Sequence, residues 1–447
     1  MRRRDFCKLV VAGAAGTLTS SWSRVSAKRP GPVDLNATVV SLPHISIRKG
    51  LLGANFVLQD KSFIAKGFNY IVLRDHDHAT FDAATKTTTA NYNATRAEAM
   101  FARLRSYGYN TVRVFIVGGR EPANPGIAGN YATTRGVYAP YMDNVIDFLR
   151  RGRRHGIYVI PTFGDGELPN NHYYQSLSCQ TCHGPNAFYF AARNIAAKEV
   201  YVNDFLAYLK QNAPETLATL LGIELQNEVC VYSNNWPFTV TRGSLKMPNG
   251  KAYNMAASVQ RRALMNEGLQ YYMNRVTAAA KAVVPDLLVA QSVFTNTAVG
   301  KNLASENYLG VWPGPYPDKR FPPDLVTLGE SLIDFMDIHY YPTMRHHTHT
   351  AIPHNFRVNL GSSLYYEPKM KVIRQSKPVI LGEFGAYKFV TKDITQAARY
   401  MVEVRNLALA AGLRGFLYWT YDGKSQSRLY YATDDGGIIL KGLAEPT

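Results

Sequence analysis

Eight short apolar segments constrain the fold of this 447-residue chain more than any other feature. They lie at 63–73, 111–115, 157–160, 220–225, 287–293, 335–341, 378–384 and 413–419, and each has the composition of a strand that is buried on both faces. Apolar residues at helical spacing, such as Ala97, Met100, Phe101 and Leu104, separate most of these segments. Strands that alternate with helices predict a parallel α/β sheet, and eight in succession favour a closed (β/α)₈ barrel over a doubly wound open sheet.

Two further features complete the predicted architecture. Residues 53–59 and the segment from 63 onward flank a turn at 60–62, which predicts a β-hairpin before the first barrel strand. Long loops are predicted at the C-terminal face, after strands three to six, and cover 164–195, 229–253, 294–334 and 342–363. Loops of this length in a compact domain are usually functional.

The N-terminus predicts an export signal. Arg2, Arg3 and Arg4 precede a mildly apolar stretch at 9–19, and Ala27 ends a plausible cleavage site. This layout is typical of a twin-arginine signal peptide over 1–27, followed by an extension at 28–50 and a catalytic domain at 51–447. We therefore expect a periplasmic or extracellular protein. The apolar stretch is shorter than the about 20 residues of a transmembrane helix, so no integral membrane segment is expected.

The charge is strongly basic, with 50 Lys and Arg against 33 Asp and Glu, a net +17. A basic balance can indicate nucleic acid or another polyanion as a partner. Here the basic residues are scattered along helical stretches such as 150–154, without a basic tail or a nucleic-acid-binding module. We interpret them as solvated helix faces with at most weak affinity for polyanions, and we expect no nucleic-acid partner. The sequence leaves the oligomeric state open.

Polar residues occur where the predicted strands end. They are Arg113 in strand two, Asn227 and Glu228 after strand four, His339 and Tyr341 in strand six, Glu383 in strand seven and Trp419 in strand eight. In a (β/α)₈ barrel these ends meet at one face, which carries the chemistry. Glu228 and Glu383 would then face each other across the barrel mouth. Glycoside hydrolysis with retention requires two carboxyl groups about 5 to 5.5 Å apart, and these two glutamates are the candidates.

The order and placement of these motifs resemble those of glycoside hydrolase family 5, in clan A of the retaining (β/α)₈ glycosidases. The resemblance extends over nearly the whole chain after the signal, through 66–70 (KGFNY), 107–113 (YGYNTVR), 227–228 (NE), 339–341 (HYY), 377–385 (KPVILGEFG) and Trp419. It implies a retaining β-glycosidase that hydrolyses β-linked glycans of the β-glucan or β-mannan type. It implies a carbohydrate substrate, and neither a cofactor nor a metal.

The resemblance also implies individual roles. Glu228 would be the general acid/base and Glu383 the nucleophile, with Arg113 and Tyr341 keeping Glu383 ionised. Asn227 would bind the 2-hydroxyl of the sugar, His339 would line the pocket, and Trp419 would form its floor. Two positions depart from the family pattern: Gly164-Asp165 stands where many members place a His, and Val229 replaces the usual Pro. A transglycosidase, or a non-catalytic carbohydrate-binding protein on the same barrel, are the alternatives.

Aromatic residues in the predicted loops are candidates for stacking on sugars, although aromatics also simply anchor loops. They are Tyr173, Tyr174, Tyr232, Trp236, Trp312 and Tyr316.

Cysteine and histidine clusters add weaker signals. Cys179-Gln180-Thr181-Cys182-His183 matches the attachment motif of c-type haem, but a disulfide is the favoured interpretation in an oxidising compartment. Cys179–Cys182, Cys179–Cys230 and Cys182–Cys230 all remain open as pairings. His346, His347 and His349, and the separate run Asp75, His76, Asp77 and His78, match no closed metal site and are interpreted as solvated loop residues.

Overall fold

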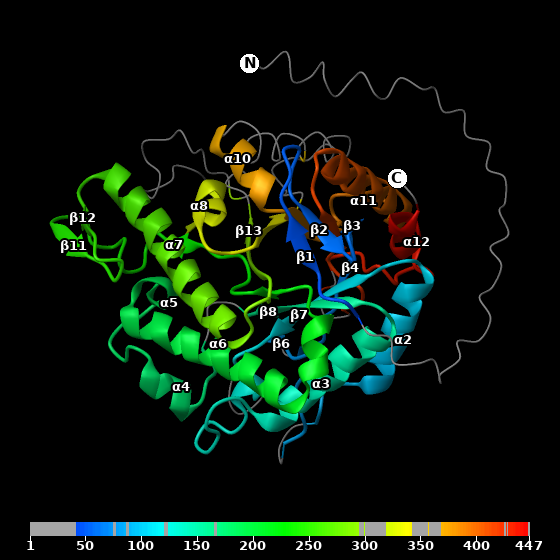
Figure 1. Ribbon diagram of the computed structural model, residues 1–447, viewed down its shortest axis with the longest axis horizontal. Helices are drawn as coiled ribbons and strands as arrows, with labels where there is room; N and C mark the ends of the chain where they lie inside the picture. The colour runs from blue at the N-terminus through cyan, green and yellow to red at the C-terminus, as the bar shows by residue number, and fades with distance from the viewer. Residues whose placement is uncertain are drawn as a thin grey trace. The chain divides into compact units, whose positions relative to one another are not determined.

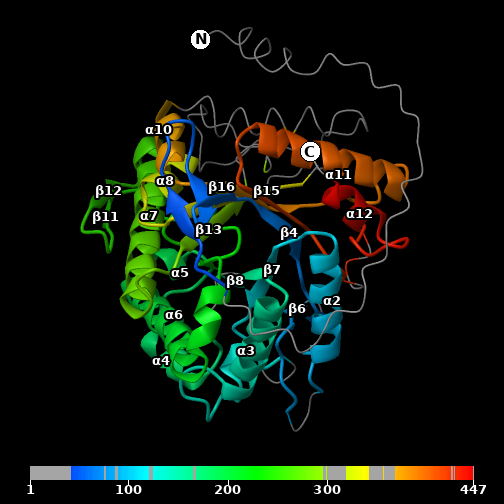
Figure 2. The same ribbon diagram turned by 45° about the vertical axis from the view of Figure 1, so that its right-hand side comes forward.

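Eight parallel strands close into a barrel in the computed structural model of the protein. The structure describes residues 42–74, 77–85, 89–119, 124–164, 168–294, 299, 319–341, 356, 368–423, 426 and 428–445, all within the unit Val39–Thr447. Around the barrel the strand order is β13-β15-β16-β17-β4-β7-β8-β9. The predicted (β/α)₈ barrel is thereby confirmed, and helices surround the strands in both ribbon views (Figures 1 and 2).

The barrel strands coincide with the eight apolar segments. They are β4 (Ala65–Asn69), β7 (Thr111–Ile116), β8 (Tyr158–Phe163), β9 (Ile223–Glu224), β13 (Val289–Phe294), β15 (Phe335–Tyr340), β16 (Val379–Phe384) and β17 (Gly415–Tyr418). All of them except β4 are buried at every position. One face of each strand fills the barrel and the other packs against helices, which explains their nearly continuous apolar sequences.

The helices lie in the connections between these strands. The main ones are α2 (Ala94–Ser106), α3 (Ala139–Arg154), α6 (Ala192–Asn212), α7 (Ser258–Val283), α8 (Leu325–Glu330), α10 (Pro368–Ser376), α11 (Ile394–Ala410) and α12 (Ile438–Ala444). Local sequence sets several of their starts. Asn93 and Asp393 each accept a hydrogen bond from a backbone N–H in the first turn of α2 and α11, which satisfies a donor that the helix itself leaves unpaired.

The predicted N-terminal hairpin is part of a three-stranded antiparallel sheet. Strands β2 (Asn55–Leu58) and β3 (Lys61–Phe63) form the hairpin, and β1 (Ser46–Arg48), from the predicted extension, pairs with β2. The third strand forms because its neighbour Ile45 is buried in one apolar cluster with Phe56, Phe63 and residues at the N-terminal ends of the barrel strands, among them Tyr158 and Phe335. The sheet thus covers the N-terminal end of the barrel.

Short elements occupy the long connections at the opposite end. The segment after β8 contains α4 (His172–Leu177) and α5 (Ala187–Phe190), and the segment after β9 contains β10 (Val231–Tyr232), β11 (Ser244–Lys246) and β12 (Ala252–Asn254). Strand β10 pairs with β14 (Arg320–Phe321), and β5 (Leu73–Arg74) pairs with β6 (Asp77–His78). Two 3₁₀ helices, Gly126–Ala128 and Pro214–Thr219, complete the described elements.

Cys179 and Cys182 form a disulfide between α4 and α5, one of the three pairings left open by the sequence. Cys230 is buried and lies outside this bond. Because both sulfurs of the haem-like motif are bonded to each other, neither is available for a thioether bond to haem.

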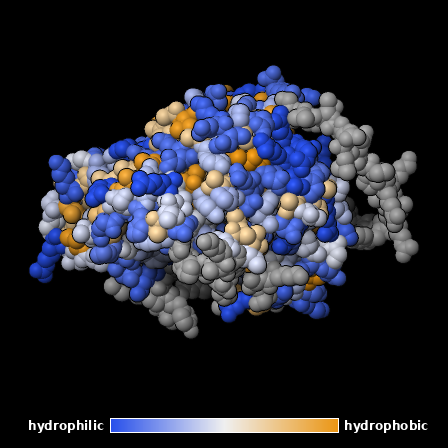
Figure 3. All heavy atoms as spheres, turned by 90° about the horizontal axis from the view of Figure 1, so that it is seen from below, coloured by the Kyte–Doolittle hydropathy of each residue, from blue (hydrophilic) through white to orange (hydrophobic). Residues whose placement is uncertain are grey.

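On the face in Figure 3, hydrophobic residues are scattered among hydrophilic ones, as on ordinary folded proteins. Within the described residues, no helix combines the length and the apolar character that crossing a membrane requires.

Candidate active site

A pocket of about 340 Å³ lies at the C-terminal ends of the barrel strands. Its lining consists of His78, Asn227, Glu228, Phe294, Val299, Arg320, His339, Tyr341, Glu383, Tyr387, Trp419, Gln426 and Leu429. Six of the seven predicted site residues are in this list, and the seventh, Arg113, lies beneath it with contacts to Glu383 and Asn227. The topology therefore brings together the residues that the strand ends indicated.

Glu383, in β16, is held by one hydrogen bond to each of its oxygen atoms. The Nη1 of Arg113 donates to Oε1 at 2.6 Å, and the hydroxyl of Tyr341 donates to Oε2 at 2.7 Å. Arg113 is fully buried in β7 and also donates to Asn227 Oδ1 at 2.9 Å. These donors fix the orientation of the Glu383 carboxyl group and favour its ionised form.

Glu228 follows β9 in a backbone conformation that few side-chain-bearing residues adopt. Its φ is 42°, in the left-handed region, which costs about 1 kcal/mol or more unless the surroundings enforce it. Ser292 enforces it from β13, because its hydroxyl accepts from the N–H of Glu228 at 3.0 Å and its carbonyl accepts from the N–H of Val229 at 3.0 Å. The turn directs the Glu228 side chain to the pocket, where 26% of it is exposed. Strain of this kind is concentrated at functional sites.

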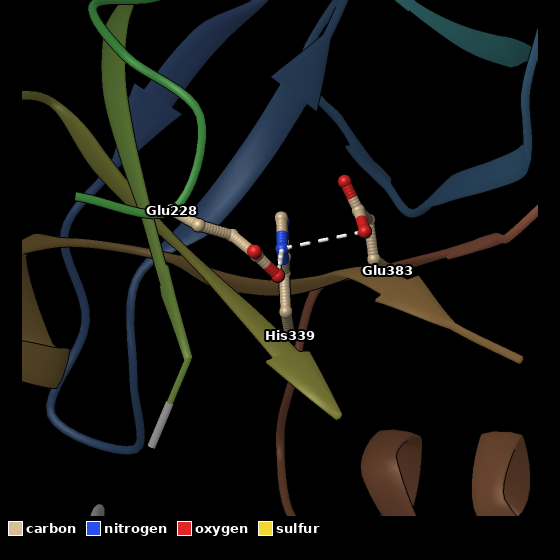
Figure 4. A group of neighbouring side chains, drawn as sticks. All are labelled: Glu228, His339 and Glu383. Carbon is tan, nitrogen blue, oxygen red and sulfur yellow. Dashed lines mark hydrogen bonds and ion pairs between the residues drawn. The ribbon is translucent and has the colours of Figure 1, made fainter. Parts of the chain in front are cut away.

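His339, in β15, lies between the two glutamates (Figure 4). Its Nδ1 is 2.9 Å from Glu228 Oε1 and 3.5 Å from Glu383 Oε2. One ring nitrogen of His339 and one carboxylate oxygen of each glutamate lie within 4.8 Å of one another. Two carboxylates and an imidazole so close together can bind a metal. However, the neighbouring carboxylates outweigh burial and raise the pKa of His339 to about 10. A protonated imidazole donates hydrogen bonds to carboxylates, so His339 and the two glutamates form a hydrogen-bonded cluster.

The protons of this cluster are coupled. Burial raises the pKa of Glu383 and the charge of Glu228 adds to this effect, against the lowering by His339 and Arg113. For Glu228, burial is outweighed by the hydrogen bond from His339, which lowers its pKa. Groups that interact so closely titrate as a unit. In the free protein, a protonated His339 therefore bridges two carboxyl groups that share their remaining protons.

Two buried acids beneath the site were not anticipated from the sequence. Glu224 accepts from both Nε and Nη2 of Arg113, at 3.0 and 2.8 Å, and from the hydroxyl of Thr162 at 3.0 Å. Asp337 lies 3.5 Å from His339 Nε2 and 3.7 Å from Arg113 Nε. Both are fully buried. Their only signal in the sequence is an acidic residue inside an apolar strand segment, which is unfavourable unless a partner neutralises it.

Trp419 and His78 line the pocket, and Phe115 packs against both. Its Nε1 donates to Gln426 Oε1 at 2.7 Å. The His78 ring stacks on Phe115, with ring centroids 4.2 Å apart, and presents its edge to Trp419 at 5.9 Å. The interpretation of His78 as a solvated loop residue is thus wrong, because the β5–β6 hairpin turns it against the barrel mouth. Asp75, His76, His346, His347 and His349 lie outside the described residues.

The loop aromatics expected to contact sugar mostly pack elsewhere. Tyr174 is fully buried and donates to Asp204 at 2.7 Å, and Tyr173 packs on Tyr174. Tyr232 and Trp236 pack against apolar clusters. None of these four lines the pocket, and Trp312 and Tyr316 lie outside the described residues. The aromatic lining comes instead from Phe294, Tyr341, Tyr387 and Trp419.

No family model and no curated protein matches the sequence. Among solved structures, the β-mannanase of the blue mussel Mytilus edulis is similar, with 13% identity and a TM-score of 0.52 over 90% of this chain and 96% of that one. The glycoside hydrolase family 5 mannosidase of Rhizomucor miehei has 12% identity and a TM-score of 0.56, over 90% and 97% of the two chains. The endo-β-1,4-mannanase of Thermotoga petrophila has 13% identity and a TM-score of 0.56, over 86% and 77%. The chain thus has the (β/α)₈ barrel fold of these mannanase and mannosidase structures.

Proposed function

We propose that the protein is a retaining β-glycosidase that hydrolyses β-linked glycans by double displacement. The observation that carries this proposal is the pair of carboxyl groups of Glu228, after β9, and Glu383, in β16, which line one pocket at the barrel mouth. Ligand oxygens of the two side chains lie within 4.8 Å of each other. Retaining glycosidases place their carboxyl groups about 5 to 5.5 Å apart, whereas inverting enzymes need about 6.5 to 9.5 Å to admit a water. The short separation supports retention.

Glu383 is the proposed nucleophile. Arg113 and Tyr341 fix its two oxygens in position for attack on an anomeric carbon in the pocket. Attack forms a covalent glycosyl enzyme and expels the leaving-group oxygen, which must gain a proton. Fixed donors on a carboxylate reduce the reorganisation needed to reach the transition state.

Glu228 is the proposed acid/base. It is the more exposed of the two carboxyl groups, at 26% against 5%, and the charge of Arg320 acts on it. In the pocket it would protonate the leaving oxygen and then deprotonate the water that releases the sugar. The roles are assigned from position because the two carboxyls and His339 titrate as one unit in the free protein. Formation of the glycosyl ester removes the charge of Glu383. Glu228 can therefore give up its proton in the first step and accept one from water in the second.

β-Mannans and β-glucans are the proposed substrate class. The solved structures with this fold are named as mannanases and a mannosidase, which makes mannans the first choice. Asn227, oriented by Arg113, is the proposed contact of the sugar 2-hydroxyl, and the indole of Trp419 is the proposed platform for the sugar ring.

Hydrolysis of aryl β-mannosides, aryl β-glucosides and β-linked oligosaccharides by the wild type, Glu228→Ala and Glu383→Ala tests the proposal. We expect activity in the wild type and a loss of at least about 10³-fold in both variants. Glu330→Ala is the matched control, because Glu330 is an exposed glutamate that pairs only with Lys369 in a surface ion pair at 3.2 Å. Proton NMR of the first product should show the β-anomer, and a 2-fluoro glycoside should label Glu383.

The outcomes separate the alternatives. An initial α-anomer, or a label on another residue, would overturn the assignment of Glu383. Transfer of sugar to an acceptor in preference to water would indicate a transglycosidase. Sugar binding without turnover on any substrate would indicate a carbohydrate-binding protein.

Export by a twin-arginine signal is a second part of the proposal. It rests on Arg2, Arg3 and the cleavage site at Ala27, all outside the described residues. We expect Arg3→Lys to reduce the amount of exported protein and Edman sequencing of exported protein to start at Lys28. Export without cleavage near this position would contradict the predicted signal boundary.

A further inference from the structure

His339 faces acidic groups on both sides of its ring. Its Nδ1 lies 2.9 Å from Glu228 Oε1 and 3.5 Å from Glu383 Oε2, and its Nε2 lies 3.5 Å from Asp337 Oδ2. His339 and Asp337 are two residues apart in β15, so both side chains project into the barrel interior. Asp337 thus lies behind the ring, on the side away from the pocket.

The fold holds Asp337 tightly in that place. The N–H of Gly382 donates to its Oδ1 at 2.6 Å. A Cβ added to Gly382 would lie 1.7 Å from Asp337 Oδ2, so only glycine leaves room for this carboxyl group. Oδ1 already accepts from the backbone, so Oδ2 is the oxygen that faces His339 Nε2, at 3.5 Å. Both atoms are buried, and neither has a hydrogen-bond partner among the described residues.

The protonation states of Asp337 and His339 determine whether Nδ1 of His339 carries a proton. When Asp337 is ionised, Nε2 donates to it and the ring is an imidazolium. When Asp337 carries a proton and the ring is neutral, Asp337 donates to Nε2 and the ring proton must be on Nδ1. When both are protonated, both ring nitrogens carry protons. In each of these three states Nδ1 keeps its N–H. A neutral ring beside an ionised Asp337 is the exception, because Nε2 then holds the single ring proton and Nδ1 has none.

We propose that Asp337 is a positioning residue that keeps a proton on Nδ1 of His339 through neutral pH, so that His339 donates to the Glu228 and Glu383 carboxyl groups. The part that concerns catalysis rests on the function proposed above. Asp337 does not line the pocket. Besides facing His339, it lies 3.7 Å from Nε of Arg113, the residue that donates to Glu383. The sequence feature behind it is the pattern Asp337-Ile338-His339 within one buried strand.

All charged and titratable groups around the ring contribute to its charge. Arg113 lies in β7, Glu224 in β9, Asp337 in β15 and Glu383 in β16. Glu228 follows β9, and Tyr341 follows β15. Burial and the charge of Glu224 raise the pKa of Asp337 to about 8, while the pKa of His339 is raised to about 10. The two groups lose their protons in that order, so Nδ1 stays protonated through neutral pH.

Asp337→Leu and Asp337→Asn test the role. Side-chain ¹⁵N NMR of His339, assigned by its absence in His339→Gln, reports the proton on each ring nitrogen without any substrate. In the wild type we expect both nitrogens protonated at pH 7. In Asp337→Leu we expect His339 to titrate at or below its ordinary pKa near 6.5, because a negative neighbour is gone while burial remains. In Asp337→Asn the pKa should also fall by at least about one unit, but the amide N–H can donate to Nε2 and preserve the neutral Nδ1–H form.

The activity profile gives a second readout. A neutral His339 no longer stabilises ionised carboxylates, so both limbs of the kcat/KM profile should shift to higher pH by about one unit in Asp337→Leu. Most of the loss should be in kcat, and Asp337→Asn should recover most of it. Thr162→Val is the matched control, because it removes a buried hydrogen bond to Glu224 without touching His339. It should leave the His339 titration unchanged.

The outcomes are separable from those of the proposed function. His339 that still titrates near pH 10 with a proton on Nδ1 in folded Asp337→Asn would overturn the inference, as would an unmoved pH profile. If Asp337→Leu does not fold, Asp337→Asn, which preserves shape, decides alone. Failure of the wild type to hydrolyse any glycoside would reject the proposed function, yet the NMR titration would still decide the role of Asp337.

Discussion

Tyr341 shows how much one hydroxyl group contributes to the site. It donates to Glu383 at 2.7 Å, and the charge of Glu383 together with burial raises its own pKa well above the ordinary value. The phenol therefore stays protonated and remains a donor throughout the accessible pH range. A hydrogen bond to a charged group contributes about 1.5 to 3 kcal/mol.

Tyr341→Phe should lower kcat by about 10- to 100-fold with little change in KM. Loss of a donor to the ionised carboxyl raises the pKa of Glu383, so the acidic limb of the pH profile should move to higher pH. Steady-state kinetics across pH measure both effects. Tyr340→Phe is the control, because Tyr340 packs against Phe356 on the other face of the same segment. An unchanged acidic limb in Tyr341→Phe would argue against Glu383 as the ionised nucleophile.

At this scale the sequence predicted the seven site residues of the strands and strand ends, but missed Glu224, Asp337 and His78. Glu228 and Glu383 follow recognisable strand patterns, and the barrel topology alone brings them together. Glu224 and Asp337 are embedded in apolar segments, and only the closed barrel reveals that both meet Arg113. His78 was missed for another reason: its place in the pocket depends on how the β5–β6 hairpin folds back, which no local pattern encodes.

Among the elements, α6 contains the least expected side chain. Lys198 is 4% exposed, and its ammonium group lies over the rings of Phe163 and Tyr201, at 4.6 and 5.2 Å from their centroids. Among the described residues it has no hydrogen-bond partner. Burial lowers the pKa of Lys198 to about 7, so the folded protein resists the charged form.

Lys198→Met should therefore stabilise the protein, and the gain should depend on pH. The unfolded chain keeps a pKa near 10.5, so between about pH 7 and 10.5 it binds a proton that the folded chain does not, and wild-type stability rises with pH in this window. The gain from methionine, on the order of 2 kcal/mol, should be largest below pH 7 and nearly absent at pH 10. Chemical denaturation at both pH values measures it. Lys210→Met, on the exposed side of α6, should show no such dependence, and a pH-independent gain at position 198 would contradict a neutral buried amine.

The strands and helices themselves were predictable because each barrel strand is apolar along its length and each helix has one apolar face. The elements inside the loops were not. Strand β10 exists only because β14, far along the chain, pairs with it, and such a pairing leaves little trace in a two-residue strand. The sequence likewise could not select the Cys179–Cys182 pairing, because the pairing depends on how α4 and α5 are placed.

At the scale of the whole molecule, few large apolar side chains of the described residues remain exposed. Leu51 and Leu52, at the turn between β1 and β2, are 86% and 97% exposed and make no buried contact that unfolding would lose. The substitution of both by serine should leave the melting temperature within about 1 to 2 °C of the wild type, because surface changes of this kind cost little. Differential scanning calorimetry tests this, with Phe56→Ser, fully buried in the same sheet, as the variant that should unfold markedly earlier. A large loss in the leucine variant would show that the turn is packed.

The three-stranded sheet at the N-terminal end of the barrel contributes to stability at a place remote from the pocket. Its apolar cluster includes Phe56, Phe63 and residues at the N-terminal ends of the barrel strands. Glu228 and Glu383 line the pocket at the C-terminal ends. The pocket and the sheet therefore lie at opposite ends of the barrel. A tether attached through Leu51 or Leu52 would therefore hold the molecule on a solid support with its pocket facing away from the support. A long polymer in solution could then still reach Glu228 and Glu383.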